Sequence, residues 1–353
     1  MQIRENIPIS ELTTMRLGGA ARYVIETTSS SEVIEAWDFA KTHNLPFWPM
    51  GGGANTIGHD EGFPGVIVLN RSKGIFLQTE ASLIPIAEVQ NQTLGSEIIL
   101  KAMAGEVWDD LVAASCDLGY SGIEALSMIP GTVGAAPVQN IGAYGQDLAQ
   151  VIQTAEVLDT ITGEILTLTE PEMGMTYRHT RFNYGADAGR FIILSITIRL
   201  TRTSLQPPFY TSLQAYVDSH NITDFSPASI RHMVCEIRSS KLPDPAKIAS
   251  AGSFFGNIYL SASEAKAAET KGIPVWSSDE GGKINSGWLI EQCGLKGKEL
   301  FGFRVSDQAA LILINESATS YADLDRARRF IVETVKDKFG YTLEQEPVEI
   351  PIK

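Results

Sequence analysis

Apolar positions along this chain repeat with two periods, and each change of period marks an expected element. Within residues 29–44, Val33 and Trp37 fall on one helical face behind a capping box of Ser29 and Glu32, which predicts a helix. A second helix is predicted at 107–118, with Val107, Leu111, Ala114 and Leu118 on one face, and a third at 226–240. Two more are predicted: one that begins after the capping box of Ser261 and Glu264, and one that runs from Ser320 to Gly340.

Strands are predicted where the period is two or where a short apolar run is bounded by turn residues. Such runs lie at residues 46–50, 65–70 and 310–315, and several strands are predicted between residues 154 and 202. Strand, helix and strand alternate in the first part of the chain, which is typical of α/β structure. The composition changes at residues 203–210, and this predicts a linker and a domain boundary after Arg202.

The composition limits which kinds of partner the chain can bind. A chain of 353 residues is long enough for two or three domains, and its net charge of −14 argues against nucleic acid and against a basic membrane-binding helix. An anionic ligand must therefore be held by backbone N–H groups or by a few cations placed close to it.

Cysteine and histidine are too few and too poorly spaced for structural metal or disulfide chemistry. The chain has three cysteines without a C-x-x-C pair and five histidines without an H-E-x-x-H motif, so we expect no disulfide framework and no metal. The first residues lack the apolar core of a signal peptide and the longest apolar runs are strand-sized, so we expect a cytoplasmic protein that does not enter a membrane.

Two glycine-rich segments are candidates for a ligand site. "GGGANT", residues 51–56, follows a predicted strand, and "IPGTVGAAPVQNIGAYGQ", residues 129–146, carries almost no charge. Glycine lets the backbone approach a flat or anionic group, although a lone GGG is more often only a tight turn. Neither the G-x-G-x-x-G nor the G-x-x-x-x-G-K-[ST] motif is present, so a nucleotide here would not lie in a Rossmann crevice.

Taken together, seven segments resemble the UDP-N-acetylenolpyruvoylglucosamine reductase family, type I branch, over nearly the whole chain. They are "GGGANT", "IPGTVGAAPVQNIGAYG", "TYRHTRFN", "SSKLPDP", "AGSFFGN", "GWLIEQCGLKG" and "LEQE". The resemblance implies an α+β fold, with a two-lobed FAD-binding domain of the vanillyl-alcohol oxidase type at 1–202 (lobes about 1–70 and 71–202). A smaller α+β substrate domain would follow at 203–353.

The activity implied by the resemblance is reduction of the enolpyruvyl group of UDP-N-acetylglucosamine enolpyruvate to UDP-N-acetylmuramate, a step of peptidoglycan precursor synthesis. Non-covalent FAD would be the cofactor and NADPH the co-substrate, in a cytoplasmic monomer. The implied FAD-binding residues are Gly51, Gly52, Gly53, Ala54, Asn55, Thr56, Ile129, Pro130, Gly131, Thr132, Gly134, Ala135, Asn140, Ile141, Gly142, Ala143 and Tyr144.

Three catalytic residues follow from the resemblance. Arg178 would clamp the substrate carboxylate and enolate with its planar fork, although an arginine in this context is more often a surface ion pair. Ser253 would donate the proton to the enolate carbon, although a serine beside glycine and phenylalanine is ordinarily a buried hydroxyl. Glu346 would stabilise the enol, with Glu344 as the substitute if the register of "LEQE" is shifted.

Substrate contacts are implied for a second set of residues: Tyr210, Arg238, Lys241 and Asn257. One departure is Ala309, where some family members have a glutamine that contacts the uridine side, and Gln308 could compensate. Two other readings remain open. An oxidase of the same flavin fold would commonly tether FAD through His or Cys, and the two glycine loops contain neither; a non-catalytic nucleotide-sugar-binding protein would not need Arg178, Ser253 and Glu346 together.

Overall fold

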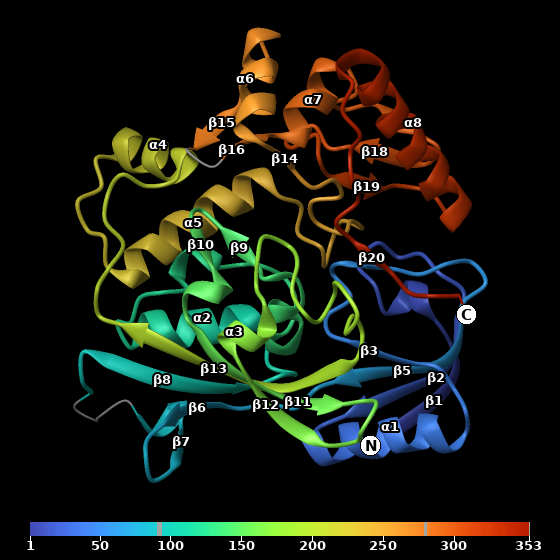
Figure 1. The fold of residues 1–353 in the computed structure, drawn as a ribbon, viewed down its shortest axis with the longest axis vertical. Helices are drawn as coiled ribbons and strands as arrows, with labels where there is room; N and C mark the ends of the chain where they lie inside the picture. The colour runs from blue at the N-terminus through green and yellow to red at the C-terminus, as the bar shows by residue number, and fades with distance from the viewer. Residues whose placement is uncertain (90–93, 279–280, 353) are drawn as a thin grey trace. The chain divides into compact units, whose positions relative to one another are not determined.

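The computed structural model describes residues 1–89, 94–278 and 281–352 (Figure 1). The chain divides into two compact units, each assembled from three separate segments. The first unit comprises Met1–Glu5, Tyr23–Gly52 and Gly65–Ser240, and the second comprises Asn6–Arg22, Gly53–Pro64 and Lys241–Lys353. The change from one unit to the other thus falls inside the "GGG" segment, between Gly52 and Gly53.

The largest sheet of the first unit is antiparallel, with the strand order β12-β11-β13-β8-β6-β7. Its strands are β6 (Ile75–Gln78), β7 (Leu83–Pro85), β8 (Glu97–Met103), β11 (Ile152–Asp159), β12 (Ile165–Thr169) and β13 (Phe191–Thr201). The strand β13 pairs with both β8 and β11, and its residues from Phe191 to Ile198 are all buried. This buried stretch is apolar except for Ser195 and Thr197, as expected for a strand that is covered on both faces.

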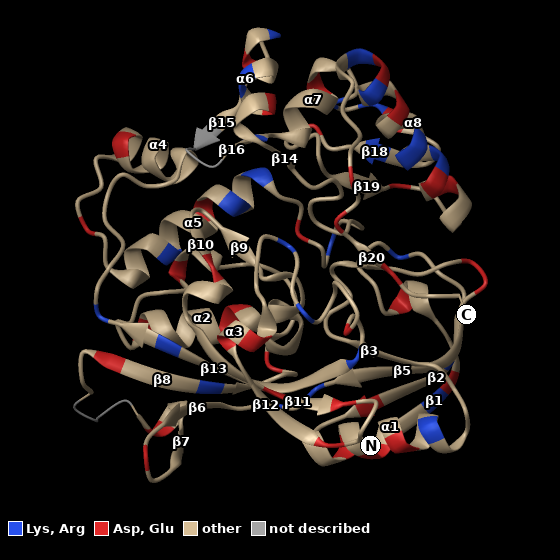
Figure 2. Cartoon of the chain, viewed as in Figure 1, with Lys and Arg blue, Asp and Glu red and all other residues tan. Residues whose placement is uncertain are grey.

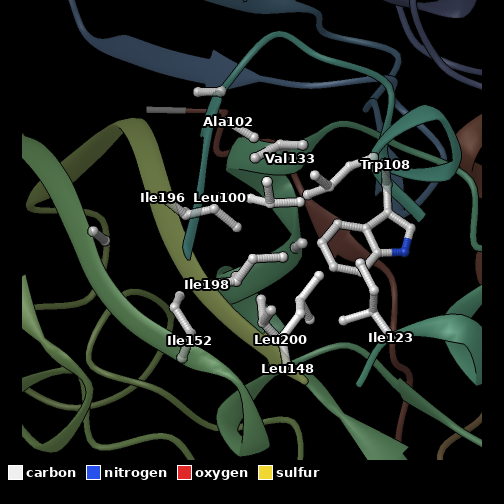
Figure 3. Close-up of a cluster of buried hydrophobic side chains, with 14 of the residues drawn as sticks. Leu100, Ala102, Trp108, Ile123, Val133, Leu148, Ile152, Ile196, Ile198 and Leu200 are labelled. Carbon is white, nitrogen blue, oxygen red and sulfur yellow. The ribbon is translucent and has the colours of Figure 1, made fainter. Parts of the chain in front are cut away.

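Helix α2 (Trp108–Asp117) packs on this sheet. Trp108 and Leu111 lie in one apolar cluster with Leu100, Ile196 and Ile198 (Figure 3). The indole Nε1 of Trp108 donates to the backbone oxygen of Leu126 at 3.0 Å, so its one polar group is satisfied inside the core. This cluster supports the start of the 129–144 loop.

A second sheet has the order β1-β2-β5-β3, and its strand β3 runs parallel to β5. Its strands are β1 (Gln2–Pro8), β2 (Ala20–Thr27), β3 (Phe47–Met50) and β5 (Phe63–Asn70). Helix α1 (Ser30–Thr42) begins as predicted at the Ser29 cap, whose side chain accepts from the Glu32 backbone N–H. The buried face of α1 contributes Val33 and Ala36 to two apolar clusters.

The remaining elements of the first unit are short or surround the 129–144 loop. The helices are α3 (Glu170–Met173), α4 (Thr211–His220) and α5 (Pro227–Lys241), and the strands are β9 (Gly142–Ala143) and β10 (Gln146–Asp147). The 3-10 turns η2, η3, η4 and η5 span Ile86–Glu88, Glu124–Leu126, Val133–Gln139 and Leu148–Gln150. Helices α4 and α5 share one cluster, which includes Leu213, Val217, Ile230 and Met233.

The described residues of the second unit form three small sheets and three helices. The sheets have the orders β14-β16-β15, β17-β18-β19 and β20-β4. The strands are β4 (Thr56–Ile57), β14 (Ile258–Leu260), β15 (Trp276–Ser278), β16 (Gly281–Ile284), β17 (Glu299–Leu300), β18 (Phe303–Val305), β19 (Leu313–Asn315) and β20 (Val348–Glu349). The helices are α6 (Ala262–Thr270), α7 (Ser286–Gln292) and α8 (Tyr321–Phe339), with the 3-10 turn η1 at Ile9–Glu11.

One apolar core holds the second unit together. Its members include Phe254, Phe255, Phe303, Ile331 and Val335, all of them buried. Helix α8 is capped at Ser320 and ends at Gly340, and α6 has the capping box of Ser261 and Glu264, so both predictions are confirmed. Among the described residues, no helix combines the length and the apolar character that crossing a bilayer requires.

Candidate cofactor and substrate site

Two glycine-rich loops lie against each other in the first unit. A Cβ atom built on Gly51 would lie 2.5 Å from Oγ1 of Thr132, and one built on Gly52 would lie 3.3 Å from Cα of Gly131. Glycine permits this approach because it has no side chain to separate the backbones. The two segments that the sequence analysis singles out therefore meet at these residues.

The 129–144 loop is packed on one side and open at Gly131. A Cβ atom on Gly134 would lie 2.6 Å from Cβ of Ala104, whereas no atom lies within 4 Å of a Cβ atom on Gly131, whose φ is +126°. Bare peptide groups beside open space can contact a flat or anionic ligand without hindrance from side chains. This arrangement fits the pyrophosphate and the flat rings of a dinucleotide such as FAD.

Arg178 is attached to the same loop. Its Nη1 donates to the backbone oxygen of Asn140 at 3.3 Å, and the Nδ2 of Asn140 donates to the backbone oxygen of Thr176 at 3.3 Å. The hydroxyl of Thr180 donates to the backbone oxygen of Val138 at 2.8 Å. The 176–180 turn is thus fastened to the loop at two points, which fixes the base of the Arg178 side chain.

Left-handed backbone conformations gather in this region. Met128, Asn140, Tyr144 and Arg178 have φ values of 57°, 42°, 50° and 59°. Residues other than glycine adopt this region at a cost, and such residues concentrate at functional sites. The conformation at Arg178 is one sign that its position serves more than a surface ion pair.

Tyr144, Tyr210 and Arg238 form a group next to the loop. The rings of Tyr144 and Tyr210 meet edge to face with centroids 6.0 Å apart, and Arg238 is hydrogen-bonded to Tyr144. Burial raises the pKa of Tyr144, so its phenol stays neutral. The Nε of Arg238 is buried and has no hydrogen-bond partner within the described part of the chain. Figure 2 shows basic residues along α5, the helix that carries Arg238.

An ion pair that the sequence analysis missed supports this group. Asp109 accepts from Nη1 and Nη2 of Arg231 at 2.6 and 2.8 Å, and from the backbone N–H of Met128 at 2.6 Å. Burial raises the pKa of Asp109, but the hydrogen bonds from Arg231 and Met128 outweigh it, so the pKa lies below its usual value. Arg238 in turn donates to the backbone oxygen of Met128 at 3.2 Å. The pair therefore anchors helix α5 to the residue that precedes the loop.

In the second unit, the segment of Ser253 lies beside the C-terminal tail. The backbone N–H of Glu346 donates to Phe254 at 3.0 Å, and that of Gly256 donates to Glu344 at 2.9 Å. Ser253 is half-buried and precedes Phe254 and Phe255, which are fully buried. The two aromatic side chains hold the serine at a fixed place along the tail.

The two glutamates of "LEQE" face different surroundings. The side chain of Glu346 lies over Gly256, where an added Cβ atom would be 3.6 Å from its Oε1, and Asn55 contacts its backbone oxygen at 3.5 Å. Glu344 is exposed. The segment that ends the "GGGANT" loop, the Ser253 segment and Glu346 are thus brought together within the second unit.

The other expected substrate residues of the second unit are scattered more widely. Lys241 is exposed at the end of α5, and Oδ1 of Asn257 accepts from the backbone N–H of Ser286 at 3.3 Å, at the start of α7. Ala309 is half-buried and Gln308 is exposed. No group of three His, Cys, Asp or Glu side chains in the described part of the chain could hold a metal ion.

A row of three side chains on the β14-β16-β15 sheet also escapes sequence analysis. Lys283 lies opposite Tyr259 on one side and Trp276 on the other, and its Nζ is 5.9 Å from the Trp276 ring centroid. Burial lowers the pKa of Lys283, while Tyr259 and Trp276 are 52% and 45% exposed. Exposed rings around a partly desolvated cation are suited to a nucleotide, and the register that joins these strands is not visible in a sequence.

Comparison with known proteins adds the family. Residues 21–169 match the model of a FAD binding domain, and residues 244–350 match the C-terminal domain of UDP-N-acetylenolpyruvoylglucosamine reductase. The reductase of that name from Aliivibrio fischeri is 35% identical over 348 residues, which is 98% of this chain and 94% of that protein. This chain belongs to the UDP-N-acetylenolpyruvoylglucosamine reductase family.

Other members of the UDP-N-acetylenolpyruvoylglucosamine reductase family give the same picture. The Ralstonia nicotianae protein is 34% identical over 349 residues, covering 97% of this chain and 98% of its own. The crystal structure of the Thermus caldophilus enzyme matches the fold with a TM-score of 0.65 at 20% identity, over 99% of this chain and all of that one. The expected fold, a FAD-binding domain followed by a substrate domain of this family, is confirmed.

Proposed function

We propose that this chain uses FAD and NADPH to reduce the enolpyruvyl group of UDP-N-acetylglucosamine enolpyruvate, giving UDP-N-acetylmuramate for peptidoglycan synthesis. The observation that carries the proposal is the full-length match to the reductases, joined with the contact of the two glycine loops in the first unit. We further propose the type I branch, a monomer and a cytoplasmic location.

The cofactor would lie on the bare backbone of the two loops. Gly51 and Gly52 let the two loops meet, Gly131 leaves open space for a pyrophosphate, and the loop residues Asn140 to Tyr144 would border the rings. FAD bound there would supply the hydride chemistry that links NADPH to the substrate. We assign residues 1–202 to FAD binding and 203–353 to the substrate, with helices α4 and α5 contributing the Tyr210 and Arg238 contacts.

Arg178 is the proposed clamp for the substrate carboxylate. Hydride addition to the terminal carbon of the enolpyruvyl group develops enolate charge next to the carboxylate, and a guanidinium can bind both oxygens of such a group in two-point fashion. The attachment of the 176–180 turn to Asn140 and Val138 supports this role because it restricts the Arg178 side chain before substrate arrives.

Ser253 and Glu346 are the proposed proton donor and enol-stabilising acid. The hydroxyl of Ser253 would protonate the enolate carbon, and Glu346 would hydrogen-bond the developing enol. Their shared position along the Phe254–Glu346 backbone contact supports the pairing, and the exposure of Glu344 favours Glu346 over it. Lys241 could stabilise the serine alkoxide or bind a phosphate.

The nucleotide part of the substrate would be bound by cations and aromatic rings. Arg238, in the first unit, has a buried Nε from which a phosphate oxygen could accept a hydrogen bond. Tyr210, on which the proposed type I assignment rests, would contact the substrate. Asn257 would contact the diphosphate.

Absorbance of the purified protein in two anaerobic steps tests the proposal. The yellow protein should bleach when NADPH is added and recover its colour when UDP-N-acetylglucosamine enolpyruvate is added, with one product formed per flavin. Control additions are UDP-N-acetylglucosamine, which lacks the double bond, and air. Recolouring by air but not by the enolpyruvyl substrate would indicate an oxidase instead, and a colourless protein that binds the nucleotide sugar would indicate a binding protein.

A further inference from the structure

The C-terminal tail carries Glu346 but has little backbone pairing of its own. Strand β20 pairs in parallel with β4 through Val348 opposite Thr56 and Glu349 opposite Ile57. The backbone N–H groups of Val348 and Ile350 donate to Asn55 and Ile57, both at 2.9 Å. Isolated two-stranded pairings are only marginally stable in water, so side-chain contacts must also stabilise the position of the tail.

The Glu349 carboxylate is surrounded by donors. Its Oε1 accepts from the hydroxyl of Tyr321 at 2.9 Å, from Nη1 of Arg328 at 2.7 Å and from Nε2 of Gln345 at 3.2 Å. Its Oε2 lies 3.1 Å from Nε2 of His59. Three donors surround Oε1 and one partner lies at Oε2, so most of the hydrogen-bonding positions of this carboxylate are used within the protein.

The partners of Glu349 are themselves held in place. Nη1 of Arg328 also donates to Oε1 of Gln345 at 2.9 Å, and Nη2 of Arg328 pairs with Asp325. The rings of His59 and Tyr321 contact each other in a tilted arrangement, with an interplanar angle of 34° and centroids 3.9 Å apart. Helix α8, which carries Tyr321 and Arg328 and bears both charge signs in Figure 2, is fixed by its buried Leu324, Ala327, Ile331 and Val335.

Residues of this network flank Glu346 in the sequence, one on each side. Gln345 forms a backbone bridge with Phe255, and Glu349 fixes the strand that follows. Between them, the backbone N–H of Glu346 donates to Phe254 and its side chain lies over Gly256. The position of Glu346 is therefore set by Gln345 before it and Glu349 after it.

We propose that Glu349 is a positioning residue that ties the C-terminal tail to helix α8 and to His59, and so holds Glu346 beside the Ser253–Gly256 segment. The proposal rests on the proposed role of Glu346. It gives Glu349 no contact with substrate.

Glu349→Ala and Glu349→Gln test the proposal, with Glu333→Gln, at an exposed glutamate of helix α8, as the matched control. We expect flavin content and reduction by NADPH to stay within about twofold of the unchanged protein. Reoxidation by substrate should slow about 10- to 100-fold in Glu349→Ala, the usual effect of losing a partner that orients a reacting group. Glu349→Gln should recover part of the rate, because its amide oxygen still accepts from Tyr321 and Arg328.

Two further measurements separate the outcomes. In the Glu346→Gln background, Glu349→Ala should slow reoxidation by no more than about twofold further, because a residue that acts through Glu346 has nothing left to position. Amide hydrogen exchange at Val348 and Ile350 should accelerate in Glu349→Ala. Multiplying effects in the double variant, or unchanged exchange at these amides, would overturn the proposal. Full activity of Glu346→Gln would instead remove the proposed role of Glu346, while exchange would still show whether Glu349 holds the tail.

Discussion

Replacing Asp109 by Asn tests the ion pair that anchors the loop. The side chain keeps its size and one acceptor oxygen, but it loses the charge and places an NH₂ group against the Arg231 fork. Hydrogen bonds to charged groups each contribute about 1.5–3 kcal/mol net. The side chains of Arg231 and Asp109 are 21% and 28% exposed, so water compensates for part of the lost hydrogen-bond energy. We therefore expect the free energy of unfolding to fall by about 2–3 kcal/mol.

Asp110→Asn is the matched control. Asp110 is exposed in the same first turn of α2, so its replacement removes only the favourable charge near the helix N-terminus, about 0.3–1 kcal/mol. Urea unfolding followed by tryptophan fluorescence and circular dichroism at pH 7 gives both values. Equal losses in the two variants would refute the two-point pair. FAD fluorescence titration should also show weaker cofactor binding for Asp109→Asn alone, because Met128 leads into the loop.

The pH dependence of the same variant has a definite sign. The pKa of Asp109 is lower in the folded than in the unfolded protein, so the pair stabilises the fold fully above the ordinary aspartate pKa of about 4. That contribution is lost as the pH falls through the folded-state pKa. The difference in unfolding free energy between the unchanged protein and Asp109→Asn should therefore be constant near neutrality and shrink in acid, and a difference that grows on acidification would contradict the assignment.

Further outcomes are expected from the proposed site. Arg178→Lys should lose most turnover although the charge is kept, because an ammonium cannot bind two carboxylate oxygens in parallel; Arg181→Lys, at a nearby ion pair, should not. Stopped-flow absorbance of Ser253→Ala should show unchanged flavin reduction by NADPH and reoxidation slowed by about 10²–10⁴, and a reoxidation loss under tenfold would remove the proton-donor role. Gly53→Ala should purify with little flavin, because its Cβ would lie 2.1 Å from the backbone oxygen of Leu12, whereas Gly145→Ala meets nothing within 4 Å. Acid precipitation should release all flavin into the supernatant, and coloured pellets would indicate a covalent link.

Helices with strong local signals could be predicted from the sequence. The caps at Ser29, Ser261 and Ser320 act within one turn of chain, so α1, α6 and α8 begin where predicted. Helix α4, which begins directly after the expected linker at residues 203–210, is not predicted because it buries only Leu213 and Val217. In α2 the predicted face is only partly right: Leu111 is buried and Leu118 packs against the core, but Val107 is 40% exposed before the helix. The other buried residues are Trp108, Val112, Ser115 and Cys116. Adjacent apolar residues leave the phase of a helix ambiguous, and only the sheet beneath it decides.

The site was predictable as a set of motifs but not as a set of contacts. Glycine-rich segments show where backbone can approach a ligand, yet nothing local indicates that Gly52 meets Gly131. The pairing of Asp109 with Arg231 spans 122 residues and that of Asn55 with Glu346 spans 291. Such contacts depend on the packed core between them, so the side chains that support the candidate catalytic residues appear only in three dimensions.

The pairing of β4 with β20 also bears on the order in which the two units can fold during synthesis. A ribosome releases the three segments of the second unit at widely separated times, and residues near position 56 must wait for the tail that borders them. Contacts this distant in sequence form late and leave early segments exposed during synthesis. Truncation a few residues before Val348 would therefore spare the first unit, which is complete by Ser240, and leave the nascent second unit without the strand that closes it.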